Sequence, residues 1–167
     1  MFWARAAYRS RQFFGALRAR VEEDERAEVA AHLTPAQQRL FHSMDLRDQR
    51  HALDVFRVLK SGGQRDPSLL AAALLHDVGK GPVKLWQRVA FVLLSVVSPG
   101  LLRRLARADE PGWRGGLART LDHAERGAAL AEEAGSTVET VRLIRLHRSP
   151  AGGDPALALL QAADEAT

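Results

Sequence analysis

The stretch LLAAALLHDVGK, residues 69–80, constrains the fold of this chain more than any other segment. An unbroken apolar run leads directly into His76 and Asp77. A helix without a polar face must be buried, and an ionised aspartate at its end is costly unless something pairs with it. The segment therefore predicts a buried helix that ends in a polar site.

Helical signals recur along nearly the whole chain, and no segment has the alternation of a strand. Thr34–Pro35, Asp66–Pro67 and Asp154–Pro155 are typical helix starts, and Gly62–Gly63 is a typical stop. The 167 residues suit one domain with a hydrophobic core. We expect an all-α fold, a single compact helical bundle with an extra N-terminal amphipathic helix. Helices are predicted over residues 22–33, 35–41, 46–61, 67–79, 85–97, 101–107, 121–135, 136–148 and 155–167.

Three of these local expectations depend on particular patterns. Residues 85–97, LWQRVAFVLLSVV, are apolar on almost every side, so we expect this helix to be buried; it is too short to span a bilayer. Ser136 and Glu139 have the spacing of a capping box at a helix start. Residues 109–116, DEPGWRGG, predict a loop.

The basic charge of the chain is concentrated at its beginning. Residues 1–20 contain five arginines and no acid, whereas the whole chain has a net charge of +4. The apolar stripe in this arm has helical spacing, so it either packs on the domain or lies on a membrane surface or a protein partner. We expect a helical arm over residues 1–33 and a domain over residues 34–167. Because the basic residues are not spread over the fold, we expect no specific nucleic-acid partner.

The chain has no cysteine, which excludes disulfides, thiolate metal sites and a cysteine nucleophile. A reducing cytosol is the default compartment for such a chain, so we expect a cytoplasmic protein.

Six polar residues lie next to core-forming segments: His51, His76, Asp77, His123, His147 and Asp164. Each histidine alone has an ordinary explanation as a hydrogen-bonded core residue, and Asp164 could pair with an arginine. Together, the imidazoles and carboxylates must satisfy one another or share a cation. A metal ion accepts neutral imidazole and ionised carboxylate and offsets the burial of both aspartates.

The order of these residues resembles the HD superfamily of metal-dependent phosphohydrolases. RHALDVFRVL resembles its first helix, LLHDVGK its signature helix and LLQAADEA its last ligand helix. DHAERGAALAEEAG and IRLHRSP resemble the subset that adds two histidines and holds two metals. That subset includes the HD-GYP phosphodiesterases and the HD-type symmetrical diadenosine tetraphosphate hydrolases. The GYP signature is absent, which favours pyrophosphate or phosphomonoester cleavage over hydrolysis of a cyclic dinucleotide.

The resemblance implies one metal held by His51, His76, Asp77 and Asp164. Asp77 would bridge to a second metal at His123 and His147. The cofactor is then one or two divalent ions, and nitrogen and oxygen ligands are compatible with Fe, Mn, Co, Ni, Zn or Mg.

The resemblance also implies a metal-activated water that cleaves a phosphoester or phosphoanhydride of a nucleotide or related compound, with Asp77 and Lys80 as catalytic residues. Lys80 follows Asp77 by three residues and could reach a phosphate. Arg47, Arg50 and Arg148 are further candidates for phosphate contact, with a solvated surface position as the alternative for each. The alternative function is a catalytically silent HD module that binds metal or nucleotide as a sensor or scaffold.

Overall fold

Every element is helical in the computed structural model, which describes residues 22–81, 83–106 and 112–167. Across these three ranges there are ten α-helices and no strand, which confirms the predicted all-α bundle. The predicted amphipathic helix in residues 1–20 lies outside the described residues. The α-helices are α2 (Glu23–His32), α3 (Pro35–Ser43), α4 (Leu46–Ser61), α5 (Pro67–Leu75), α6 (Leu85–Val97), α7 (Pro99–Leu105), α8 (Trp113–Leu121), α9 (His123–Glu133), α10 (Val138–Leu146) and α11 (Pro155–Ala166).

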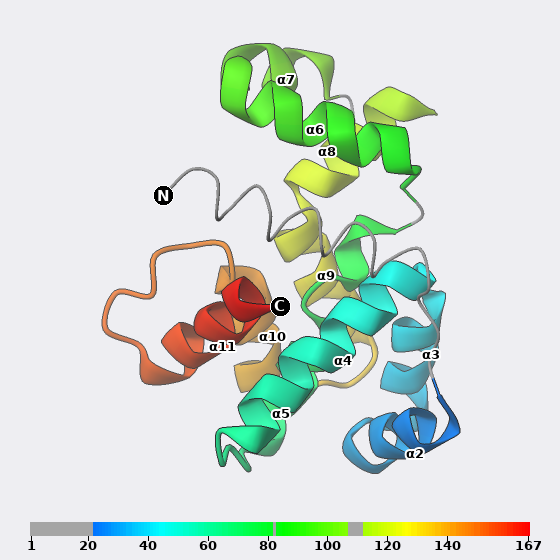
Figure 1. Ribbon diagram of the computed structural model, residues 1–167, viewed down its shortest axis with the longest axis vertical. Helices are drawn as coiled ribbons and strands as arrows, with labels where there is room; N and C mark the ends of the chain where they lie inside the picture. Colours follow the sequence, from blue (N-terminus) through cyan, green and yellow to red (C-terminus); the bar gives the residue numbers. More distant parts are fainter. Residues whose placement is uncertain (1–21, 82, 107–111) are drawn as a thin grey trace.

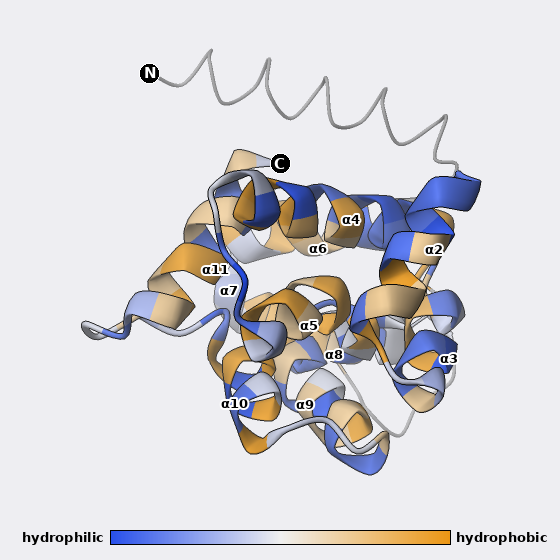
Figure 2. Ribbon diagram, turned by 90° about the horizontal axis from the view of Figure 1, so that it is seen from below, coloured by the Kyte–Doolittle hydropathy of each residue, from blue (hydrophilic) through white to orange (hydrophobic). Residues whose placement is uncertain are grey.

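The apolar helix α5 occupies the centre of the bundle, and Figure 2 shows its hydrophobic ribbon among the other helices. All seven of its residues from Leu69 to Leu75 are buried, as the sequence predicts. It contacts α2, α3, α4, α10 and α11. The helix that carries the His-Asp pair is therefore fixed on all sides by the core.

Three helices begin where the sequence predicts. Thr34, Asp66 and Asp154 each accept a hydrogen bond from a backbone N–H in the first turn, and each is followed by proline. The side-chain oxygen replaces a missing intrahelical partner, and proline lacks the N–H that would be unsatisfied there. These caps set the starts of α3, α5 and α11.

The helix α5 ends earlier than predicted, at Leu75, and a 3₁₀ turn, η2 (Val78–Lys80), follows His76 and Asp77. This turn lies against the start of α9. A Cβ at Gly79 would lie 2.0 Å from the carbonyl oxygen of His123 and 2.6 Å from the backbone nitrogen of Gly127. Glycine therefore allows the two backbones to approach, which brings Asp77 close to α9.

The short helix α2 is held on the bundle by both apolar and ionic contacts. Val29 is part of the hydrophobic core. Glu25 is buried, with a side chain only 3% exposed, and it pairs with Arg50 and with Arg57 of α4. Residues 22–33, the described part of the predicted arm, thus pack on α4 and on the core.

Two local predictions were wrong. Helix α10 begins with Thr137 as its cap, whose hydroxyl accepts from the backbone N–H of Thr140. Ser136, the predicted cap, instead accepts a hydrogen bond from Gln37 of α3. The predicted loop over residues 109–116 includes the start of α8, which begins at Trp113, and Gly116 in its first turn packs tightly against Gln87 of α6.

The helices α6 and α7 and the start of α8 form an outer tier at one end of the molecule, above the bundle in Figure 1. The prediction that residues 85–97 form a buried helix was wrong. Val96 and Val97 are 75% and 80% exposed, because α6 packs chiefly on α7 and α8 and not on the central helix. Among the described residues, no helix is long and apolar enough to cross a membrane.

Candidate metal centre

All six predicted ligand residues come together at one place in the bundle. They arrive from separate elements, so the site depends on the packing of the whole domain. His51 lies on α4, His76 and Asp77 follow α5, His123 begins α9, His147 follows α10 and Asp164 lies in the last turn of α11.

The first group of donors contains His51, His76 and Asp77, whose ligand atoms all lie within 4.8 Å of one another. Asp164 completes it. Its Oδ1 lies 2.8 Å from Nε2 of His51 and 3.6 Å from Nε2 of His76. Nε2 of His76 also lies 3.6 Å from Oδ2 of Asp77. Two carboxylates and two imidazoles thus surround a small common volume.

The second group contains Asp77, His123 and His147, whose ligand atoms also lie within 4.8 Å of one another. Oδ1 of Asp77 is 3.6 Å from Nε2 of His123, and the Nε2 atoms of His123 and His147 are 3.1 Å apart. Asp77 therefore belongs to both groups and offers one oxygen to each. These two groups could hold a metal ion.

Three of the rings are oriented by the backbone. The Nδ1 atoms of His76, His123 and His147 lie 2.9, 2.7 and 2.6 Å from the carbonyl oxygens of Ala73, Thr120 and Ile144. A carbonyl only accepts, so each Nδ1 carries the hydrogen. In the neutral ring Nε2 then presents a lone pair, and all three Nε2 atoms face the cluster.

This arrangement leaves the lone pairs without donors. Nε2 of His76 is buried and has no hydrogen-bond partner. The Nε2 atoms of His123 and His147 face each other at 3.1 Å with no hydrogen between them when both rings are neutral. A buried unsatisfied nitrogen is unfavourable. A cation that accepts several lone pairs resolves both defects, so these residues fit a metal ion.

The pKa shifts of His123, His147 and Asp77 favour the same charge state. Burial lowers the pKa of His147 to about 4 and also lowers the pKa of His123. Burial opposes ionisation of Asp77, but Lys80 and the surrounding histidines outweigh it and hold the Asp77 pKa well below its usual range. Neutral imidazoles beside an ionised carboxylate are the forms that bind metal.

The interaction between Asp164 and His76 shifts the pKa of each group in the direction opposite to the effect of burial. Burial would raise the pKa of Asp164, but the hydrogen bond with His51 and the charge of His76 lower it. Burial would lower the pKa of His76, but the carboxylates of Asp77 and Asp164 outweigh it and raise that pKa. The two carboxylates therefore stabilise a positive charge between them, which a proton on His76 or a metal ion can supply.

The four residues predicted to contact substrate differ in their position relative to the ligand cluster. Lys80 is partly exposed, and its Nζ pairs with Oδ2 of Asp77. Arg47 lies one turn before His51, and its buried Nε has no hydrogen-bond partner. Arg148 is exposed beside His147, and its charge contributes to the lowered pKa of His123. Arg50 does not join the cluster, because its guanidinium pairs with Glu25 and Asp54.

Sequence reasoning missed two residues that position the ligands. Gln161 of α11 donates hydrogen bonds to the carbonyls of His147 and Ser149 and so fixes the turn after His147. The Thr167 hydroxyl lies 3.2 Å from Nδ1 of His51. Gln161 lies within LLQAADEA, but nothing in that segment marks it as a partner of the turn after His147. Each of the two residues contacts a residue on a different element, so no local signal in the sequence could identify its role.

A cavity of about 640 Å³ lies beside the outer tier, away from the cluster. It is lined by Asp45, Val83, Lys84, Trp86, Gln87, Gly112, Trp113 and Arg119. None of the six candidate ligands lines it, so the cavity and the metal centre are separate features.

Comparisons of the chain with protein families, with curated proteins and with solved structures return no match.

Proposed function

We propose that this protein is a metal-dependent phosphohydrolase that cleaves a phosphoester or phosphoanhydride bond of a nucleotide or a related compound. The observation that supports it most is the cluster of buried, oriented Nε2 lone pairs around the shared carboxylate of Asp77. Divalent ions bound there would lower the pKa of a water molecule and neutralise charge on a phosphoryl group.

The residues of the chain would divide the remaining tasks. His51, His76, Asp77 and Asp164 would hold one ion, and Asp77, His123 and His147 the second. Asp77 has the central role, because its two oxygens lie in different donor groups. The hydrogen bonds from Nδ1 to the backbone keep the rings in the metal-binding tautomer and orientation.

Lys80 supports the assignment of a phosphorylated substrate. Its ammonium group is partly exposed and lies at the edge of the cluster, where it now pairs with Asp77. A phosphate group that enters the site would give Lys80 a second anionic partner.

Arg47 and Arg148 are the further cations of this proposal: Arg47 lies one turn before His51, and Arg148 directly follows His147. The buried Nε of Arg47 has no hydrogen-bond partner, so a phosphate oxygen would satisfy it. Arg50 is committed to holding α2 and has no part in this proposal.

The test combines metal content with hydrolysis. The protein is purified without added metal, its bound metals are measured by elemental analysis, and it is then assayed on a phosphomonoester and on a dinucleotide polyphosphate with each divalent ion in turn. We expect near-stoichiometric metal and hydrolysis that a chelator abolishes. His76→Gln should lose both properties, because it removes a buried ligand while it keeps a similar volume.

A matched control is His42→Gln, which changes an exposed histidine on α3 and should keep metal and activity. A folded protein that binds no metal would contradict the whole proposal. A protein that binds metal but hydrolyses neither substrate with any ion would instead support a catalytically silent module that acts as a sensor or scaffold.

A further inference from the structure

The orientation of α6 is the reverse of that expected for a helix on a folded domain. The side chains most exposed to solvent are Trp86, Val89, Val92, Leu93, Val96 and Val97. At 100° per residue these positions share one face of the helix, and we refer to them as the α6 face. The polar residues Gln87 and Arg88 lie on the opposite side and point towards the protein.

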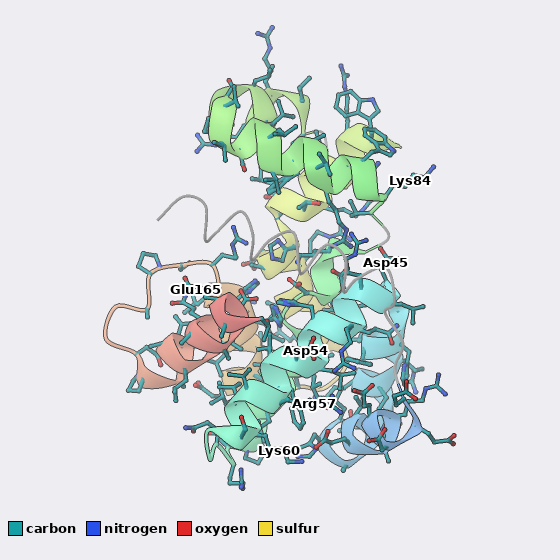
Figure 3. All side chains as sticks on the ribbon, in the orientation of Figure 1. Asp45, Asp54, Arg57, Lys60, Lys84 and Glu165 are labelled. Atoms are coloured by element: carbon teal, nitrogen blue, oxygen red, sulfur yellow. The ribbon has the colours of Figure 1, made fainter. Side chains whose placement is uncertain are left out.

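Polar contacts hold α6 in this orientation. Arg88 pairs with Asp48 at 2.5 Å and with Asp45 at 3.3 Å, which ties α6 to the start of α4. Figure 3 shows Lys84 at the start of α6, above Asp45. Gln87 is buried, and its Oε1 accepts a hydrogen bond from the backbone N–H of Lys84. Because these groups are satisfied on the inside, the apolar side of the helix is left facing outwards.

Other exposed apolar side chains lie on the two helices that pack with α6. Leu101 of α7 is exposed, and the rings of Trp86 of α6 and Trp113 of α8 lie 6.5 Å apart. A large apolar patch is uncommon on a protein surface unless something binds there.

The described residues of the outer tier carry charge of one sign. Residues 83–106 and 112–121 contain no aspartate or glutamate, whereas the sequence between them, residues 107–111, contains one arginine and two acids, residues 109 and 110. The cations of these two ranges are Lys84, Arg88, Arg103, Arg104, Arg114 and Arg119. Lys84, Arg103 and Arg104 are exposed. Exposed cations thus lie at the start of α6 and on α7, the helix that packs with it.

We propose that the α6 face docks on an anionic lipid membrane, with α6 lying in the plane of the interface. Valine and leucine side chains would enter the boundary between headgroups and acyl chains, and the exposed lysine and arginines would contact anionic headgroups. Trp86 and Trp113 suit the same depth, because tryptophan prefers the membrane–water interface. A helix of 13 residues is about 20 Å long, which is enough to lie on a bilayer but not to cross one.

Charge distinguishes this occupant from a second copy of the chain. In a two-fold symmetric contact the same patch meets itself, so one interface would gather Lys84, Arg103 and Arg104 of both copies. An anionic membrane complements both the apolar side chains and their positive border. The proposal concerns a surface separate from the metal centre and does not depend on phosphohydrolase activity.

The test is cosedimentation of the full-length protein with extruded vesicles. One set contains phosphatidylcholine alone, and the other contains phosphatidylcholine mixed with phosphatidylglycerol. We expect binding to the mixed vesicles that weakens as salt is added. The double variant Leu93→Gln/Val97→Asn should bind roughly tenfold more weakly, because it removes two exposed apolar side chains from the interface. Arg103→Gln/Arg104→Gln should lower binding to the mixed vesicles and leave binding to phosphatidylcholine unchanged.

The matched control is Val138→Asn, which changes a valine of 88% exposure at the start of α10, outside the outer tier. It should bind like the parent. Circular dichroism checks that each variant is folded, which is expected because all the altered side chains are exposed. Failure of the parent to bind mixed vesicles overturns the proposal. Unchanged vesicle binding by Leu93→Gln/Val97→Asn also overturns it, because another part of the chain, such as residues 1–20, would then bind the vesicles. Dimerisation that this double variant abolishes, without vesicle binding, would show that the face is a subunit interface.

Discussion

At the scale of single residues, Asp77 is the position on which both donor groups depend. Asp77→Asn keeps the size of the side chain but removes the charge that offsets the repulsion between two cations. We expect weaker metal binding and a fall in phosphohydrolase rate of several orders of magnitude. Folding should suffer less than metal binding, because the neutral amide keeps the volume of the side chain, although its ion pair with Lys80 is lost.

The measurement is a comparison of metal content, hydrolysis rate and thermal unfolding between the parent and Asp77→Asn. Asp122→Asn is a suitable control, because Asp122 is an exposed aspartate near the site whose side chain does not cap α9. Full activity of Asp77→Asn on a substrate that the parent cleaves would exclude Asp77 as the shared ligand.

The second donor group can be tested separately from the first. His123→Ala/His147→Ala removes two imidazoles and leaves His51, His76 and Asp164 in place. We expect the loss of roughly one metal equivalent, because the two groups share only Asp77. Elemental analysis compares the metal content of the folded double variant with that of the parent. An unchanged metal content would mean that the centre holds a single ion.

At the scale of elements, the contact between η2 and α9 sets the distance between Asp77 and His123. Gly79→Ala would place a methyl group against the carbonyl of His123, so the two segments must separate. We expect a loss of roughly 3 kcal/mol in the free energy of unfolding, together with weaker metal binding. Denaturant unfolding measures the first effect and metal titration the second.

The control for this substitution is Gly100→Ala in α7, where a Cβ would meet nothing within 4 Å. Alanine has the higher helix propensity, so this variant should be at least as stable as the parent. If Gly79→Ala were equally stable and bound metal normally, the close approach of η2 and α9 would have no role in the site.

The ion pairs between α2 and α4 predict a dependence of stability on pH. Burial would raise the pKa of Glu25, but the hydrogen bond and charge of Arg50 outweigh it, and the pKa is lowered. The stabilisation is therefore complete above the pKa of the unfolded chain, about 4.3, and is lost as the pH falls through the lower pKa of the folded state. Glu25→Gln should destabilise the protein by roughly 1–3 kcal/mol at pH 7.

Unfolding curves of the parent and Glu25→Gln, measured between neutral and acidic pH, check this expectation. The difference in the free energy of unfolding should shrink as the pH falls from about 4.3 towards the lower pKa of the folded state, where the parent carboxyl is protonated as well. Glu23, an acidic and exposed residue of the same helix, provides the control Glu23→Gln, which should change stability little at any pH. A pH-independent difference would show that packing, not charge, carries the effect of Glu25.

Local signals account for the elements that the sequence predicts correctly. The caps at Thr34, Asp66 and Asp154 act within one turn, and the apolar run of α5 has no alternative to burial. The misplaced elements depend on partners far along the chain. The Ser136 hydroxyl accepts a hydrogen bond from Gln37 of α3. Arg88 on the polar side of α6 pairs with Asp45 and Asp48 at the start of α4, so that side faces the protein. Hydrophobicity alone predicts burial for α6, because it carries no information about where an ion pair will anchor the helix.

The sequence could predict which residues belong to the candidate site, but not how they are arranged. Polar residues beside apolar segments stand out in the sequence, and the six residues selected in this way lie together in the structure. The pairing of His51 with Asp164, 113 positions apart, follows from the packing of α11 on α4. The hydrogen bond from each Nδ1 to a backbone carbonyl could not be predicted from the sequence either, since any residue type supplies that carbonyl.

At the scale of the whole molecule, the candidate centre links helices from the start, middle and end of the described chain. Bound metal should therefore stabilise the entire fold. At a free metal concentration of 100 times Kd the linkage is about 2.7 kcal/mol, which corresponds to a rise in Tm of roughly 5–10 °C for a domain of this size. Thermal unfolding with added metal and with chelator measures it. His76→Gln should show no rise, and a parent Tm that is the same in both conditions would argue against a bound ion.

The three histidines whose Nδ1 atoms bond to backbone carbonyls also mark where helices stop. His76 and His147 directly follow the last residues of α5 and α10, His123 comes just after α8, and Asp164 lies in the final turn of α11. The C-termini of α5, α8, α10 and α11 thus lie at the cluster, and α9 begins there. Each C-terminus carries about half a negative charge from its aligned peptide dipoles. The backbone itself therefore makes this point in the bundle attractive to cations, and that attraction persists when any single ligand is replaced.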